Sequence, residues 1–251
     1  MVEKLEPHAA RPLGETGVVA PVDEGLRTYM LRVYNYMASG VLLTGIMAML
    51  TFESPAVASL LFQITPDGQY ITGYTGLGWV VAFSPLIFVF AMSFGAHRMR
   101  ASTLQGMFWA FAAVMGLSLS SVLFIYTGIS VTRIFFITAA AFGTLSLWGY
   151  TTKKDLSGWG SFLIMGVFGI LIAMVVNWFL ASPAIDYGIS ILGVLIFAGL
   201  TAYDTQKIKR MYYEGDSHEM ASKKAIMGAL RLYLDFINMF LFMLRLFGGR
   251  R

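Results

Sequence analysis

The chain has 251 residues, of which 57% are hydrophobic and only 13% are charged. These proportions differ from those of a soluble domain and indicate an integral membrane protein. The absence of cysteine excludes a disulfide framework and thiol chemistry. The net charge of +4 does not indicate nucleic-acid binding, because the basic residues lie in short loops between apolar stretches, where they set membrane topology.

The N-terminal segment, residues 1–27, is polar and contains three prolines and mixed charges. It lacks the short apolar core and the small-residue cleavage site of a signal peptide, so we expect a flexible cytoplasmic tail. No long polar block follows this segment. Residues 28–251 are therefore expected to form one transmembrane domain.

Seven apolar stretches follow, each near the ~20 residues that a spanning helix needs. They are Val33–Phe52, Trp79–Ala96, Met107–Gly128, Ile134–Tyr150, Trp159–Leu180, Gly188–Asp204 and Leu230–Phe247. The prediction is an all-α integral membrane protein built as a seven-helix bundle. Residues 53–78 form the long loop after the first span, and its apolar segment Ala56–Phe62 is expected at the membrane interface.

Pairs of small residues in the middle spans predict close contacts between helices. Ala139 and Gly143 lie at positions i and i+4 of one span, and Gly169 and Ala173 repeat this spacing in the next. Small residues at this spacing allow helix backbones to approach closely in lipid.

Lysine and arginine are distributed unevenly between the two sides of the predicted bundle. The N-terminal side carries Lys4, Arg11, Arg27, Arg32, Arg98, Arg100, Lys153, Lys154, Lys207, Lys209, Arg210, Lys223 and Lys224, whereas the loops on the other side carry Arg133. The positive-inside rule therefore places the N-terminus in the cytoplasm. Seven spans would leave Arg250 and Arg251 outside, against the same rule, so the sequence leaves the side of the C-terminus open.

Two aspartates lie in strongly apolar surroundings: Asp204 in LTAYDTQKIK and Asp235 in RLYLDFINMFLF. An ionisable side chain inside a membrane is costly to keep, so it is a functional hypothesis by default. The predicted topology brings both residues near the cytoplasmic side, at similar depth, where they can share a site. The structural alternative is that Asp204 only caps its helix end or pairs with Lys207.

The chemistry of two adjacent carboxylates predicts a response to pH. Ionising both carboxyl groups at once is costly in a medium of low dielectric constant, so we expect the pair to share a proton near neutral pH. The deprotonated pair offers oxygen ligands to Ca²⁺, or to an arginine, and protonation releases either one. Arg98 closes the second span on the same side and is the expected counter-ion. We expect no permanently bound cofactor.

A mainly polar stripe surrounds the second aspartate. Arg231, Asp235, Asn238, Phe242 and Arg245 recur at helical spacing on the last span. Such a stripe is expected to face protein or water, with Arg231 and Asn238 as supporting polar residues.

Three segments resemble the Bax inhibitor family of small transmembrane proteins: FAGLTAYDTQKIK, RLYLDFINMFLFMLRLFG and TTKKDLS. The resemblance covers nearly everything after about Arg27. It implies a seven-helix bundle with the last helix central, and a pH-sensitive Ca²⁺ leak channel or regulator. In that family the aspartate pair senses pH, and an arginine at the end of the second helix is its latch partner. By position this arginine resembles Arg98, with Arg100 as a nearby competitor.

The resemblance also bears on location. The chain ends in GGRR and lacks the lysine-rich tail of the eukaryotic members, so a bacterial inner membrane is favoured.

Two other functions remain open. One is a non-conducting regulator that binds a partner such as a membrane protease. The other is an intramembrane aspartyl protease, which fits less well because Tyr233 and Leu234 precede Asp235 where that class has glycine. We expect no enzyme, since Ser118, Ser120 and Ser121 have no histidine within an apolar segment to activate them.

Overall fold

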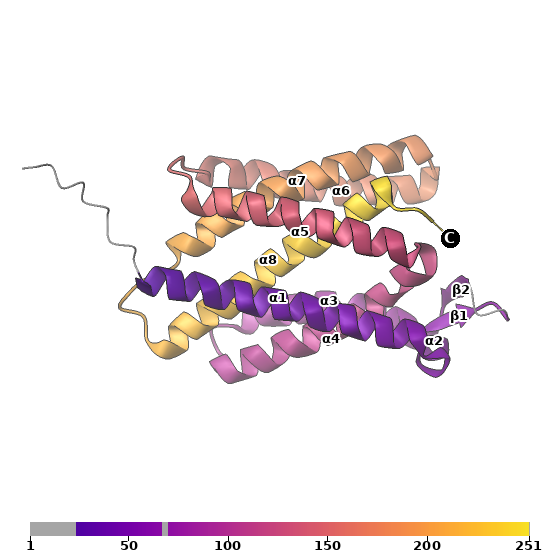
Figure 1. Ribbon diagram of the computed structural model, residues 1–251, viewed down its shortest axis with the longest axis horizontal. Helices are drawn as coiled ribbons and strands as arrows, with labels where there is room; N and C mark the ends of the chain where they lie inside the picture. The colour runs from indigo at the N-terminus through magenta and orange to yellow at the C-terminus, as the bar shows by residue number, and fades with distance from the viewer. Residues whose placement is uncertain (1–23, 67–69, 251) are drawn as a thin grey trace, which may run out of the picture.

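The computed structural model describes residues 24–66 and 70–250 (Figure 1). Its elements are α1 (Glu24–Glu53), α2 (Pro55–Leu61), β1 (Phe62–Ile64), β2 (Ile71–Tyr74), α3 (Gly76–Gly95), α4 (Ala101–Ile125), α5 (Gly128–Thr151), α6 (Ser157–Leu180), α7 (Pro183–Arg210) and α8 (His218–Phe247). The predicted tail lies outside the described residues up to position 23. Residues 24–27, which we assigned to the tail, belong to α1 instead.

The prediction of seven spanning helices is confirmed. α1 and α3 to α8 are all long and apolar enough to cross a membrane. α8 begins at His218 and not at Leu230, because its first turns are polar and escape a search for apolar runs. The Ser217 side chain caps this start by accepting a hydrogen bond from the backbone N–H of Met220.

The last helix is the centre of the bundle, as expected. In α8, 67% of the most apolar stretch is buried, against 11–33% in the other six spans. α8 contacts α1 and α4 on one side and α5 and α7 on the other. Figure 1 shows α8 running obliquely between a group formed by α1, α3 and α4 and a group formed by α5, α6 and α7. We call these the first and second groups.

The two ends of the bundle differ in charge. The start of α1, the α3–α4 turn, the α5–α6 loop and the α7–α8 loop lie at one end, which we call the basic face. The hairpin β1–β2, the α4–α5 and α6–α7 turns and the end of α8 lie at the other end, which we call the opposite face (Figure 1).

The residues after α8 are fixed to the opposite face. The backbone N–H of Thr127 donates to the carbonyl of Gly249 at 3.0 Å, and the N–H of Gly249 donates to the hydroxyl of Ser130 at 2.8 Å. α8 is therefore a complete span, and Arg250 lies on the face opposite to the basic loops.

The long loop packs partly on the bundle. Phe62 pairs with Tyr74 in the antiparallel hairpin, and Ala58, Leu61 and Phe62 are buried against Phe124 of α4. The inner side of this segment thus covers a protein surface, while Val57 and Leu60 are exposed, and its location at the membrane interface stays a prediction.

Close helix contacts occur at other glycines than those predicted. A Cβ at Gly116 would lie 2.5 Å from the carbonyl oxygen of Thr44 in α1, and a Cβ at Gly149 would overlap the backbone of Ala202 in α7. A Cβ at Gly143 or at Gly169 would meet nothing within 4 Å. The prediction from small-residue spacing was therefore wrong at both glycines, whereas Ala139 and Ala173 do pack against the core. Spacing alone does not reveal which face of a helix is packed.

Candidate functional site

α7 and α8 run antiparallel and pack tightly in the middle of their contact. A Cβ on Gly193 would lie 2.5 Å from the ring of Phe242, so only glycine leaves room for that ring. Phe242 stacks on Phe197 with their ring centroids 5.9 Å apart. This packing sets the register in which Asp204 of α7 comes level with Asp235 of α8.

The structure brings the two aspartates together. The two carboxyl groups act on each other across the α7–α8 contact. The Asp204 side chain is 14% exposed, and Asp235 is buried at 4%. Oδ2 of Asp235 has no hydrogen-bond partner among the described residues. Two neighbouring carboxyl groups in surroundings of low dielectric constant do not both ionise cheaply, so the arrangement suits a pair that binds one proton.

The cation beside this pair is Arg231. Its Nη1 lies 3.7 Å from Oδ1 of Asp204, and its side chain is 41% exposed. Arg231 precedes Asp235 by one helical turn, so it reaches across to α7 from the helix that holds the other carboxyl group. The charge of Lys207 also acts on Asp204 from the next turn of α7.

The predicted counter-ions do not lie at the pair. Arg98 and Arg100 are exposed in the turn between α3 and α4, and α3 packs mainly on α4, α2 and β2. Arg100 instead acts on Glu219 at the start of α8. In this conformation the structure assigns the counter-ion position to Arg231, which we had predicted only as a supporting residue.

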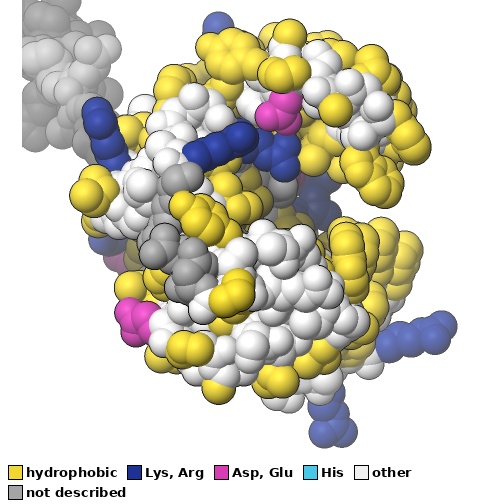
Figure 2. Space-filling view, turned by 90° about the vertical axis from the view of Figure 1, so that its right-hand side faces the viewer, with side chains coloured by type: hydrophobic (Ala, Val, Ile, Leu, Met, Phe, Trp, Pro, Cys, Tyr) yellow, Lys and Arg dark blue, Asp and Glu magenta, His cyan; other side chains and the backbone are white. Residues whose placement is uncertain are grey.

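The polar stripe of α8 divides between the core and a cleft. Phe242 is buried, whereas Arg231, Asn238 and Arg245 are only partly covered. The side-chain amide of Asn238 donates to the carbonyl of Leu234 at 2.8 Å. Figure 2 shows the opposite face hollowed between the two groups, with hydrophobic side chains on both lips and Lys or Arg side chains between them. The stripe was expected to face protein or water, and the structure buries two of its members, Asp235 and Phe242, in protein.

A second ion pair joins α7 and α8 near the opposite face. Nη1 of Arg245 lies 3.9 Å from Oδ1 of Asp186. Both residues line a cavity of about 380 Å³ together with Arg250. The α7–α8 contact thus has a charged pair toward each end.

Comparison with known proteins identifies the family of this chain. Residues 26–251 match the family described as inhibitor of apoptosis-promoting Bax1. The chain belongs to the Bax inhibitor-1 family. It is 50% identical to an uncharacterized protein of Caulobacter vibrioides over 232 residues, which cover 92% of each chain. It is 42% identical to the inner membrane protein YbhL of Escherichia coli over 229 residues, which cover 90% of this chain and 94% of YbhL.

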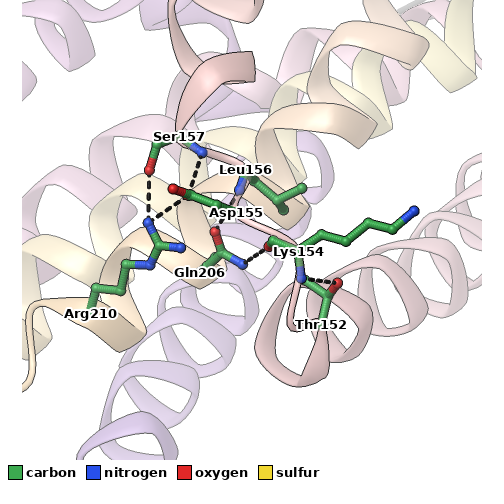
Figure 3. Close-up of polar contacts among 7 residues, drawn as sticks. All are labelled: Thr152, Lys154, Asp155, Leu156, Ser157, Gln206 and Arg210. Carbon is green, nitrogen blue, oxygen red and sulfur yellow. Dashed lines mark hydrogen bonds and ion pairs between the residues drawn. The ribbon is translucent and has the colours of Figure 1, made fainter.

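In this Bax inhibitor-1 family member, the TTKKDLS segment anchors the end of α7 (Figure 3). The buried amide of Gln206 donates to the carbonyl of Lys154 at 2.8 Å and accepts from the N–H of Leu156 at 2.9 Å. Arg210 pairs with Asp155 at 2.8 Å. We call these contacts the α7 clasp. They hold the turn of α7 that immediately follows Asp204.

Hydrogen bonds within the clasp also set the ionisation of Asp155. The backbone N–H of Ser157 donates to Oδ1 of Asp155 at 2.9 Å. The pKa of Asp155 is lowered from 3.8 to about 2, and this bond is the main cause. The hydrogen bonds from the Ser157 hydroxyl and from Arg210 lower it further. The exposed carboxylate is therefore charged at every pH at which the protein is expected to work.

A chain of hydroxyl groups crosses the bundle beside the aspartates. The hydroxyl of Tyr34 in α1 lies 2.7 Å from that of Ser146 in α5, which lies 2.8 Å from that of Thr205 in α7. Ser146 and Thr205 are buried. This chain links the two groups at the level of Asp204, the residue that precedes Thr205.

The site has few side chains that could bind a metal ion. The described residues contain no group of three or more His, Cys, Asp or Glu side chains that could hold a metal ion. Ca²⁺ takes six to eight oxygen ligands, so Asp204 and Asp235 would have to be supplemented by backbone carbonyls or water. Such a pair fits transient binding better than permanent occupancy.

Three residues of the site were missed or undervalued from the sequence. Arg231 could have been found from its one-turn spacing to Asp235. Gln206 and Arg210 follow Asp204 at positions that a helix turns toward the loop, but no pattern in the sequence shows that the TTKKDLS segment is their partner.

Proposed function

We propose that this protein is a pH-controlled leak for Ca²⁺, or a related cation, with Asp204 and Asp235 as the proton-sensitive site and Arg231 as their counter-ion. The observation that carries the proposal is the pairing of Asp235, which is 4% exposed, with Asp204, which is 14% exposed, at the contact of α7 with the central helix α8. A buried carboxyl pair inside a membrane is expensive, and a purely structural role has cheaper solutions.

The proposed mechanism is a competition for the carboxyl oxygens. With one shared proton the pair is compact and holds one negative charge, which Arg231 balances at 3.7 Å. Loss of the proton adds a second charge that Arg231 alone does not balance, and this favours entry of a cation. Oδ2 of Asp235, which has no partner among the described residues, is the oxygen that such a cation would use.

The proposed location is a bacterial inner membrane with the basic face in the cytoplasm. The positive-inside rule supports this orientation. The similarity to YbhL, which is an inner membrane protein, supports the location. The carboxyl pair would then lie nearer the cytoplasm, since Asp204 is close to the end of α7 on the basic face.

The test is Ca²⁺ flux into proteoliposomes across a pH series. We expect protein-dependent flux whose pH response disappears in Asp204→Asn and in Asp235→Asn. The matched control is Glu214→Gln, because Glu214 is an exposed carboxylate in the α7–α8 loop on the same face. Asp155 and Asp186 are poorer controls, since both form ion pairs.

The result also separates the competing functions. If Glu214→Gln flattens the pH response as the two membrane variants do, the carboxyl pair is not the sensor. If no variant and not even the native chain gives flux above empty liposomes at any pH, a regulator that binds a partner protein replaces the leak.

A further inference from the structure

Two cavities lie between α1 and α5, where the two groups face each other and the hydroxyls of Tyr34 and Ser146 form a direct link. The first is lined by the N-terminal half of α1 and by the part of α5 near the basic face. The second is lined farther along α1, with α4, α5 and α8. Each has a volume of about 400 Å³. We call them the basic-side cavity and the far cavity.

The basic-side cavity has apolar walls and a charged mouth. Its lining includes Leu31 on α1 and Phe142, Gly143 and Leu147 on α5. The hydrogen-bonded hydroxyls of Tyr34 and Ser146 also line it, so their polar atoms are already paired with each other.

The mouth of this cavity lies at the basic face. Arg27, one turn after the start of α1, is exposed and lines the cavity together with Tyr150. The ammonium group of Lys209 donates to the carbonyl of Tyr150 at 2.8 Å and lies 4.8 Å from its ring centroid. Positive charge and a tyrosine ring thus meet at the depth where lipid headgroups begin.

We propose that the basic-side cavity binds one anionic phospholipid of the adjacent leaflet, with an acyl chain between α1 and α5 and its phosphate at Arg27. From Arg27 to Tyr34, α1 rises about 10 Å, which is less than half of the ~30 Å hydrocarbon core. The cavity therefore lies within one leaflet. Its apolar walls match the chain, and its charged mouth matches the phosphate.

The volume argues against a protein helix as the occupant. A helix 10–12 Å across occupies roughly 400–600 Å³ for each 5.4 Å turn, so the cavity would take no more than one turn. A single acyl chain is thin enough to enter along the length of the cavity. The far cavity has no charged residue among the described residues that line it, so its lining gives no reason to select a headgroup.

Gly143 provides a direct test, because a Cβ there would meet nothing within 4 Å while the residue lines the cavity. Leucine at this position fills the cavity. The matched control is Gly169→Leu in α6, where a Cβ also meets nothing within 4 Å but the residue is exposed on the outside of the bundle. For the headgroup, Arg27→Gln is compared with Lys153→Gln, which removes a charge from an exposed residue on the same face.

The measurement is native mass spectrometry of the full chain in detergent, titrated with dioleoyl phosphatidylglycerol, with dioleoyl phosphatidylcholine or with inorganic phosphate. We expect one phosphatidylglycerol per chain in the native protein and in both controls, and at least tenfold weaker binding in Gly143→Leu. Arg27→Gln should lower the preference for phosphatidylglycerol over phosphatidylcholine about fivefold, the effect of one basic residue near a membrane surface.

Three results would overturn the proposal. Gly143→Leu could bind phosphatidylglycerol as well as Gly169→Leu does. Arg27→Gln could leave the headgroup preference unchanged, and this decides the matter if Gly143→Leu does not fold. Inorganic phosphate could compete as effectively as the lipid, which would mean an anion site without an acyl chain. None of these readouts depends on whether the protein conducts ions.

Discussion

Replacing Arg231 with glutamine removes the cation beside the carboxyl pair while keeping a long polar side chain. The charges of Arg231 and Asp204 are 3.7 Å apart. At that distance Coulomb's law gives about 4.5 kcal/mol for an effective dielectric constant of ~20 and about 1 kcal/mol for water. Because the arginine side chain is 41% exposed, solvent screens much of the larger value. Lys207 remains nearby as a partial substitute. We therefore expect a coupling energy of about 1–2 kcal/mol between Arg231 and Asp204.

A double-mutant cycle measures this coupling. The free energy of unfolding is determined in mixed detergent micelles for the native chain, Arg231→Gln, Asp204→Asn and the double variant. The same cycle with Arg98→Gln is the matched comparison, because Arg98 is exposed in the turn between α3 and α4. A coupling for Arg231 below about 0.5 kcal/mol, within the range of independent sites, would refute the assignment. A larger coupling for Arg98 would return the counter-ion role to Arg98.

Other contacts give further predictions. Asp155→Asn should lower the melting temperature at neutral pH, because a carboxyl group with a lowered pKa stabilises the fold above about pH 4. The difference from the native protein should disappear as the pH falls toward 2. A difference that is unchanged at about pH 2 would contradict the ion-pair argument. Gly149→Ala should destabilise the protein by about 1–3 kcal/mol, because the added Cβ overlaps the backbone of α7. Gly143→Ala should be neutral or stabilise the protein by up to about 1 kcal/mol. Equal melting temperatures of the two variants would show that the α5–α7 contact is looser than described. Gln206→Leu leaves the buried N–H of Leu156 and the partly buried carbonyl of Lys154 unpaired and should cost about 1–3 kcal/mol of unfolding free energy. A cost under about 0.5 kcal/mol would argue against the α7 clasp.

The spans and the aspartate pair could be predicted from sequence because each depends on local composition. A spanning helix satisfies its own backbone hydrogen bonds, so an apolar run of sufficient length is enough to find it. Asp204 and Asp235 stand out because charges are rare in such runs. α8 began earlier than predicted, since its first turns pack with polar residues on the basic face and have no need of apolar composition.

The contacts between helices could not be predicted in the same way. Arg98 and Arg231 are both basic residues near the same membrane side, and only the packing of α3 away from α8 distinguishes them. Gly143 and Gly149 lie in one helix, yet one borders a cavity and the other touches a neighbouring backbone. Information of this kind belongs to the tertiary arrangement, where residues far apart in the chain become neighbours.

The central position of α8 has a consequence for biosynthesis. Every other described helix leaves the ribosome before α8, yet the first and second groups contact each other mainly through α8. During translation the inner surfaces of both groups must therefore wait in the translocon or in lipid until the last helix arrives. A ribosome that stalls before His218 would release a truncated product that has the other six spans but lacks α8. The exposed inner surfaces of this product would distinguish it from the finished protein for a membrane quality-control protease.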